Sequence, residues 1–272
     1  APFFLDVHEV SSQDLAAFLA SLGGKVFVED DSDDHYPRFV HLERPDGFKP
    51  VLVDLWPEGS GIVYNERREF AAKAGEERRP ARQVTWFGAH LYCASRGKRL
   101  PTEAEWERAA RGLTDRRFPW GDAAPTCGGV ALKQGSWVAF AGGAGPACEA
   151  EAARAGGGVP AGGALPRPWV IAAAAQDVTP DGIHDLGGNV SEWVDASFAA
   201  GGAAPGPVTP EDVVRHDLPM VVRGGSLGES FLARTTARAH WVGTAAAQDI
   251  GFRCAASAPK ETGTTYSRED TP

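Results

Sequence analysis

The sequence predicts an α+β fold with many short strands, few helices and much loop. Short apolar stretches alternate with glycine and proline, and eight tryptophans are spread through this turn-rich sequence. Strands and helices without a regular βαβ alternation are typical of α+β domains. The chain has neither a strand–GxGxxG–helix unit nor a phosphate-binding loop of the GxxxxGKS type, which disfavours a nucleotide-binding, doubly wound sheet.

The N-terminal residues predict a strand followed by a helix. Residues 3–10 read as a strand. Ser11 or Ser12 is expected to cap a helix that ends at Gly23-Gly24. The apolar residues of this helix recur at helical spacing: Leu15, Phe18, Leu19 and Leu22. An acidic stretch follows at 29–35, and we read it as a solvated loop because it lacks the glycine and closing glutamate of an EF-hand.

Two more helices are expected in the middle of the chain, after a strand at 51–56. The first runs from about Trp86 to Ser95 and ends before Gly97. The second begins at the capping box Thr102–Glu105, in which the threonine hydroxyl and the glutamate each bind a backbone amide of the other's residue. It is expected to end at Gly112.

The chain of 272 residues fits one large domain. We expect this domain to cover residues 1–258, with a Gly/Ala-rich insertion loop at 128–168 and a polar C-terminal tail at 259–272. The segment 128–168 is read as an insertion, because the recognisable motifs described below lie on both sides of it.

The charge of the chain disfavours a nucleic-acid partner. With 27 basic and 36 acidic residues the formal net charge is −9, and the basic runs are short. Phosphate binding needs clustered lysine and arginine. No window approaches the ~20 apolar residues that a membrane-spanning helix needs, so membrane association is expected only through partners.

Four cysteines permit two disulfide bridges, and no CxxC or Cys/His spacing indicates zinc. Cys93 and Cys254 are 161 residues apart, whereas Cys127 and Cys148 flank a Gly-rich stretch. If bridges form, the protein belongs in an oxidising compartment. The alternative is four buried, reduced thiols.

Several motifs of the chain, in this order, resemble the formylglycine-generating enzyme family. They are RLPTEAEWE at 99–107, GNVSEW at 188–193, RGGS at 223–226 and GFRC at 251–254. The resemblance spans nearly the whole chain and implies an irregular, loop-rich α+β fold related to C-type lectins. It also implies a Cys93–Cys254 bridge, which is favoured over a Cys127–Cys148 one.

The resemblance fails at the reactive group. Active members of the family are expected to carry two copper-binding cysteines between RGGS and GFR. Here the interval 227–250 contains no cysteine, and the single methionine, Met220, lies before RGGS. A Cu(I) site needs such soft ligands. We therefore expect neither copper nor formylglycine-generating oxidase activity.

The resemblance also implies a structural calcium ion at the GNVSEW motif. Side-chain oxygens of Asn189 and Glu192, with the backbone carbonyls of Gly188 and Val190, would supply oxygen ligands. The alternative is that Asn189 only stabilises a local turn.

Arginines gather near the C-terminal motifs. They are Arg223, Arg234, Arg238 and Arg253. Because arginine forms rigid, bidentate hydrogen bonds, we expect them to clamp loops together; a carboxylate ligand is the alternative. Ser226 has no GxSxG context and is expected to hold a turn.

These observations predict a non-catalytic binding or structural subunit, outside the bacterial cytoplasm, that docks on a larger protein complex. Residues 128–168 and 259–272 are the candidate docking arms. The alternative is a divergent metal-dependent oxidase, or an enzyme that modifies a peptide or small molecule, although the seven histidines show no HxxxHxE spacing. A third reading is a sensor module of a longer chain.

Overall fold

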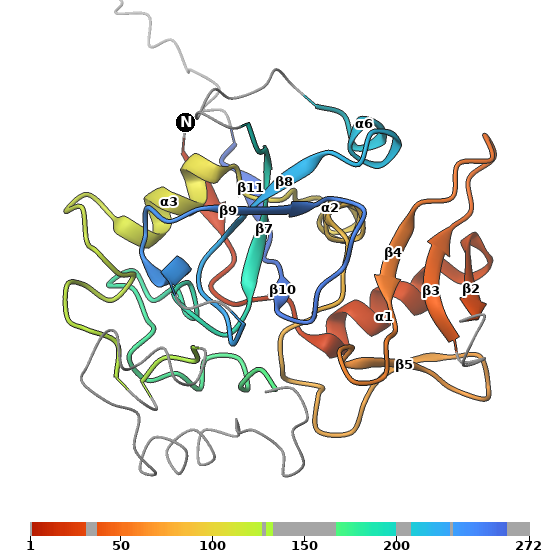
Figure 1. Cartoon of the computed structure of the whole chain (residues 1–272), viewed down its shortest axis with the longest axis horizontal. Helices are drawn as coiled ribbons and strands as arrows, with labels where there is room; N and C mark the ends of the chain where they lie inside the picture. Colours follow the sequence, from red (N-terminus) through yellow and green to blue (C-terminus); the bar gives the residue numbers. More distant parts are fainter. Residues whose placement is uncertain are drawn as a thin grey trace, which may run out of the picture.

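The computed structural model describes residues 2–30, 37–126, 129–132, 167–199, 208–228 and 231–259. This part of the chain folds into short helices and four small sheets, which confirms the predicted α+β class (Figure 1). Most of the predicted insertion, the tail from residue 260, and both Cys127 and Cys148 lie outside the described residues.

The helix and strands between residues 12 and 72 form a layer, which Figure 1 shows in red and orange on the right. A three-stranded antiparallel sheet has the order β2-β3-β4, and β5 and β6 form a separate antiparallel pair. The elements are β1 (Phe3–Leu5), α1 (Ser12–Leu22), η1 (Gly23–Lys25), β2 (Val26–Asp30), β3 (Pro37–Leu42), β4 (Val51–Asp54), β5 (Ile62–Tyr64) and β6 (Phe70–Ala72).

Helix α1 has the predicted bounds and the predicted caps. The Ser11 hydroxyl accepts a hydrogen bond from the Asp14 amide at 3.1 Å, and Gly23 ends the helix with a φ of 54°. Leu15, Phe18 and Leu19 are buried on one face. Helical spacing of these apolar residues therefore placed the helix correctly.

Helices α2 (Trp86–Ser95) and α3 (Glu103–Arg111) also match their predicted bounds. Both hydrogen bonds of the Thr102–Glu105 capping box are present. In α2, a Cβ atom on Gly88 would lie 2.3 Å from the backbone oxygen of Leu52, so only glycine lets the helix approach β4 this closely. Helix α2 is consequently a central element of the core rather than a surface helix.

The C-terminal part contributes a four-stranded sheet with the order β10-β7-β8-β9. Strand β10 runs parallel to β7, whereas the other pairs are antiparallel. The elements are β7 (Ser191–Ser197), α6 (Pro210–Arg215), β8 (Pro219–Arg223), η2 (Phe231–Ala233), β9 (Ala239–Val242), β10 (Ile250–Gly251) and β11 (Ala255–Ser257). Strand β11 pairs antiparallel with β1, so the two ends of the domain close on each other.

Two predicted strands are shorter than expected. The strand predicted over 3–10 ends at Leu5, because the next residues bind two different segments: the Asp6 amide donates to the Cys254 carbonyl and the Val7 carbonyl accepts from the His184 amide. The strand predicted over 51–56 ends at Asp54, whose carboxylate accepts the Trp56 amide at 2.9 Å and turns the chain.

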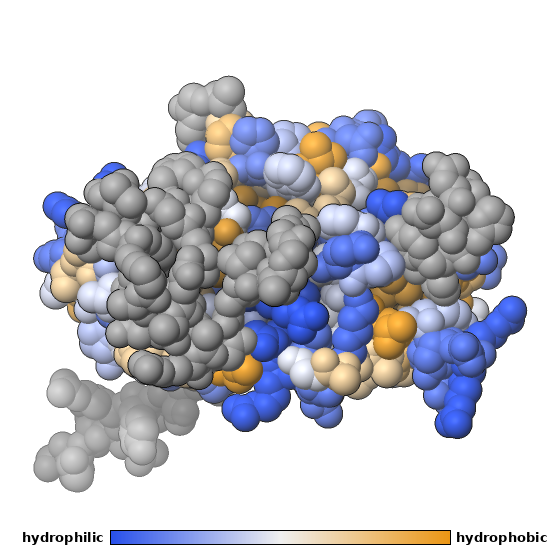
Figure 2. All heavy atoms as spheres, turned by 60° about the horizontal axis from the view of Figure 1, so that its bottom comes forward, coloured by the Kyte–Doolittle hydropathy of each residue, from blue (hydrophilic) through white to orange (hydrophobic). Residues whose placement is uncertain are grey.

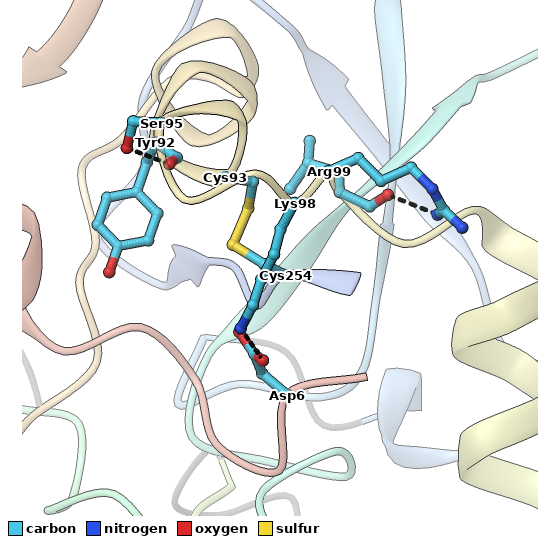
Figure 3. Close-up of a disulfide and its surroundings, with 8 residues drawn as sticks. Asp6, Tyr92, Cys93, Ser95, Lys98, Arg99 and Cys254 are labelled. Atoms are coloured by element: carbon cyan, nitrogen blue, oxygen red, sulfur yellow. Dashed lines mark hydrogen bonds and ion pairs between the residues drawn. A yellow bond between two sulfur atoms is a disulfide. The ribbon is translucent and has the colours of Figure 1, made fainter. Parts of the chain in front are cut away.

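The Cys93–Cys254 disulfide is present and joins α2 to the segment between β10 and β11 (Figure 3). Both cysteines are fully buried. Beside the bridge, Lys98 forms an ion pair with Asp6, at the end of β1 (Figure 3). The disulfide therefore sits where the N-terminus, α2 and the C-terminal segment meet.

Tryptophans connect the core through their indole N–H groups. Trp86 of α2 donates to the Val194 carbonyl of β7, and Trp193 of β7 donates to the Val84 carbonyl just before α2. Both side chains are buried in the main apolar cluster, which α1, β4, α2 and the C-terminal strands share. These reciprocal bonds fix the helix against the sheet.

The visible surface is mainly polar. On the face shown in Figure 2, hydrophobic residues outside the grey regions appear as small, separate spots between hydrophilic ones. No helix among the described residues is long and apolar enough to cross a membrane.

Removing the disulfide should destabilise the protein strongly. The bridge closes a loop with a sequence separation of 161 residues. In the chain-entropy model such a loop stabilises the fold by about 4 to 5 kcal/mol. We expect the double variant Cys93→Ser/Cys254→Ser to lose about this free energy of unfolding in a denaturant titration. A loss close to zero would show that the bridge is incidental to stability.

Candidate functional site

Two glycine-containing segments pack directly against each other: the RGGS motif, and Gly187 with the GNVSEW motif that follows it. A Cβ atom on Gly225 would lie 2.5 Å from the Gly187 carbonyl oxygen, and one on Gly224 would lie 2.8 Å from the Leu186 carbonyl oxygen. Gly224 also has a φ of 79°, which side-chain-bearing residues rarely adopt. These glycines allow β8 and the loop before β7 to touch through their backbones.

The centre of this region is a fully buried ion pair between Arg253 and Glu192. The Arg253 guanidinium contacts the Glu192 carboxylate at 2.6 to 2.9 Å, and it also donates to the carbonyls of Asp6 and His184. The Trp106 indole N–H donates to Oε2 of the same carboxylate at 2.8 Å. Burial lowers the pKa of Arg253, but the carboxylates of Glu192, Glu9 and Asp185 together more than offset this, so the pKa of Arg253 is raised.

Arg223 forms a second buried connection, from β8 to α3. Its guanidinium donates to Glu103 at 2.7 Å, to Glu107 at 2.9 Å and to the Thr235 carbonyl at 2.6 Å. The same guanidinium lies over the Trp106 ring, 5.1 Å from its centroid. The two glutamates are four residues apart on α3, so both reach the same arginine.

The other two arginines of the predicted set lie nearer the surface. Arg238 binds the second oxygen of Glu103 at 2.8 Å and stacks over Phe198. Arg234 is exposed, and its carbonyl accepts a hydrogen bond from Ala237. Arg223, Arg238 and Arg253 thus bind carboxylates of this chain.

Two of the four residues predicted as calcium ligands, Asn189 and Glu192, make contacts within the chain in this structure. Both oxygens of Glu192 face the Arg253 guanidinium, whose charge would repel a cation. The Asn189 carbonyl oxygen accepts from the Trp169 amide at 2.7 Å. The described residues contain no group of three or more His, Cys, Asp or Glu arranged to hold a metal ion. Glu192 thus has an internal partner here, and calcium binding by Gly188, Asn189, Val190 and Glu192 stays a prediction.

A group of buried carboxylates surrounds this motif, and sequence analysis did not find it. Glu9, Asp177 and Asp185 are each at least 96% buried. The Asn189 amide donates to one Glu9 oxygen at 2.8 Å, and the Gly187 amide donates to Asp177 at 3.0 Å. The other Glu9 oxygen is buried without a hydrogen-bond partner among the described residues. No pattern in the sequence distinguishes these acids from exposed ones.

Burial raises the pKa of all three carboxyl groups. Desolvation is the main cause for each, and neighbouring carboxylates add to it: Asp185 and Glu192 raise the pKa of Glu9, and Asp185 raises that of Asp177. The pKa of Asp185 is raised to about 6, although the Ala172 amide and Arg253 act in the opposite direction. Burial therefore favours the protonated form of these three carboxyl groups.

Ser226 holds a turn, as predicted. Its hydroxyl donates to Asp249 at 2.8 Å and accepts from the Gly228 amide at 3.0 Å. Residues 229 and 230, in the interval where active family members are expected to have cysteine, lie outside the described residues. The charged groups around this interval mainly join segments of the chain, which favours a structural role for the motifs.

We expect Arg253→Met to lower the free energy of unfolding by about 3 to 5 kcal/mol, because it leaves the Glu192 charge buried and unpaired. Adding Glu192→Gln should recover part of this loss. Arg99→Met is a matched control, since its ion pair with Glu105 is partly exposed, at 31% and 16%, and should be worth about 1 kcal/mol or less. Equal losses in the two single variants would contradict the central role of Arg253.

Asp185→Asn should change how stability depends on pH. A carboxyl group whose pKa rises from 3.8 to about 6 on folding binds more protons in the folded state between these values. Its contribution to stability is therefore present at low pH and is lost as the pH rises through about 6. Asparagine mimics the protonated form, so we expect the variant to be more stable by about 3 kcal/mol at pH 8.

This gain should vanish below about pH 4 in calcium-free buffer, as followed by denaturant unfolding. The control is Asp181→Asn, an exposed aspartate in the same loop. An Asp185→Asn variant less stable than the unmodified protein at pH 8 would show that the carboxylate is needed in its charged form.

Comparison with known proteins places the chain in a family. A model described as the sulfatase-modifying factor enzyme 1-like domain matches residues 1–258. The inactive C-alpha-formylglycine-generating enzyme 2 of Bos taurus is 29% identical over 283 residues, covering 96% of this chain and 79% of that protein. The formylglycine-generating enzyme of Thermomonospora curvata is 30% identical over 273 residues, covering 94% and 82%.

Among solved structures, PvdO from Pseudomonas aeruginosa has a similar fold, with a TM-score of 0.51 and 20% identity over 94% of this chain and 81% of that one. The match to the family model, the sequence motifs and the fold all indicate the same family. The chain belongs to the formylglycine-generating enzyme, or FGE-sulfatase, family.

Proposed function

We propose that the chain is a non-catalytic binding or structural subunit that docks on a larger protein assembly. The observation that carries this proposal is the interval between RGGS and GFRC. Residues 227–250 contain no cysteine, and the single methionine of the chain precedes them. Without thiolate or thioether side chains, this interval lacks the ligands that a Cu(I) centre requires.

The contacts around the motifs support the same proposal. Arg223, Arg238 and Arg253 bind glutamates of their own chain, and Arg253 and Glu192 are fully buried. The Arg253 guanidinium already donates to Glu192 and to the carbonyls of Asp6 and His184, so it is not available to orient a substrate. These groups keep a loop-rich fold together, which a binding module needs as much as an enzyme does.

One relative carries a name that fits this role. The protein of Bos taurus is called inactive and matches 96% of this chain. The name applies to that protein alone. It supports the proposal because it describes a member of this family as lacking formylglycine-generating activity.

An oxidising compartment, outside the cytoplasm, is part of the proposal. The Cys93–Cys254 bridge is the supporting observation, because structural disulfides persist where thiols are not kept reduced. The predicted docking arms at 128–168 and 259–272 fall mainly outside the described residues and contribute no structural argument.

The alternative is a divergent enzyme of the same family, with a different metal or none. The observation that favours it is the relative from Thermomonospora curvata, which is named as a formylglycine-generating enzyme and is 30% identical over 94% of this chain. Identity of this extent preserves the fold, whereas chemistry depends on individual side chains.

Native affinity purification from the source organism distinguishes the two functions. We expect the tagged chain to co-elute with one defined set of proteins, at fixed stoichiometry, through a second size-exclusion step. Copper and iron measured by plasma mass spectrometry should be far below one ion per chain. A monomer that carries stoichiometric copper or iron would overturn the proposal and support the enzyme.

A further inference from the structure

An apolar groove of about 520 Å³ lies along β1, outside the motifs described above. One wall is β1 itself, a second is the C-terminal end of α3 with the turn after it, and a third is the loop at 180–183. Its apolar lining includes Phe3, Phe4, Leu5, Val7, Leu113 and Ile183. The function proposed so far uses none of these residues.

Exposed apolar side chains concentrate at this groove. Among the described residues six large apolar side chains are exposed, and three of them line it: Phe4 at 62%, Val7 at 47% and Leu113 at 85%. Leu5 and Ile183 pack against the cluster that includes Trp106, so the floor of the groove is anchored to the core. Gathered apolar residues of this kind mark binding surfaces, whereas single ones do not.

One backbone edge of β1 has no partner strand in the described part of the chain. Strand β1 pairs only with β11 there. The Pro2 carbonyl accepts from Ala258 and the Asp6 amide donates to Cys254. Backbone groups alternate between the two edges of a strand, so Phe3 and Leu5 direct theirs away from β11. Because Phe3, Phe4 and Leu5 all line the groove, it follows this open edge.

Positive charge borders the groove on a chain whose net charge is −9. Arg108 is exposed and forms no ion pair with any described residue. The Arg116 guanidinium donates to the Ala110 carbonyl at 3.1 Å, and its Nε atom has no hydrogen-bond partner within the described residues. Asp181 is the one acidic residue among the lining residues. The rim therefore favours a ligand with negative charge.

We propose that this groove binds an extended segment of a partner protein in which apolar side chains alternate with acidic ones. The segment adds as a strand to the open edge of β1, places its apolar side chains against Leu5 and Ile183, and pairs its carboxylates with Arg108 and Arg116. This inference rests on the proposed binding function and identifies the docking surface and the chemistry of its partner.

The direct test is fluorescence anisotropy with a short synthetic peptide in which valine and phenylalanine alternate with aspartate. We expect saturable binding that weakens as salt is added. A peptide with lysine in place of aspartate, and one N-methylated at alternate residues, should bind at least about tenfold more weakly, through loss of charge pairing and of strand hydrogen bonds respectively. Equal binding of all three peptides would overturn the proposal.

Variants of the protein locate the binding. Arg108→Glu should weaken binding of the acidic peptide about tenfold or more, and Leu113→Asp should weaken it as well. Both residues are exposed, so the fold should tolerate these changes. Arg67→Glu, another exposed arginine outside the groove, is the matched control and should leave binding unchanged. If Arg67→Glu weakened binding as much as Arg108→Glu, the net charge of the protein would explain the effect, and the proposal would be overturned.

The same variants separate this inference from the proposed function. If the native complex forms equally well with Arg108→Glu and with the unmodified chain, the groove proposal fails while the binding function stands. If the unmodified chain forms no complex, the function fails and peptide binding alone decides the groove. Peptide binding that occurs only after removal of residues 260–272, or a dimer that Arg108→Glu dissociates, would assign the groove to this chain and overturn the proposal.

Discussion

The fold depends on the buried pair of Arg253 and Glu192. An arginine taken out of water needs an acceptor for each donor, and here these acceptors come from β7, from Asp6 after β1 and from His184. Trp106 of α3 completes the shell of Glu192. Burial of two opposite charges is unfavourable unless their remaining hydrogen-bonding groups are also satisfied. The pair therefore couples the folding of segments that are distant in the sequence. The disulfide at Cys254, next to Arg253, joins α2 to the same place. This is how a chain with short strands and much loop keeps one arrangement.

Local structure was predictable because its causes lie within a few residues. The caps at Ser11 and Thr102 and the glycines at 23 and 112 specify where α1 and α3 begin or end, and the structure has these bounds. The Cys93–Cys254 bridge came instead from resemblance to a family, since four cysteines alone allow several pairings. Strand ends were less predictable: β1 stops at Leu5 because residues far along the chain bind Asp6 and Val7.

The candidate site was predictable only in part, for the same reason. The sequence brought attention to Arg223 and Arg253, but their partners lie elsewhere in the chain: Glu103 and Glu107 on α3, and Glu192 on β7. The contact between Glu192 and Arg253 was not predicted, because the spacing of a motif says nothing of a guanidinium 61 residues away. Burial of Glu9, Asp177 and Asp185 depends on packing by several segments, which no local pattern reports.

The groove and the buried network share two elements, which links binding to stability. Helix α3 directs Trp106 and Glu107 toward the network and carries Arg108 at the groove. Strand β1 lines the groove, while the carbonyl of Asp6, the next residue, accepts from Arg253. A segment that adds to β1 would therefore contact β1 and α3, whose positions the ion pair already fixes. A rigid edge loses little conformational entropy when a partner binds. The ion pair of Arg253 and Glu192 thus stabilises the fold and also holds in place the β1 edge to which we propose that a partner binds.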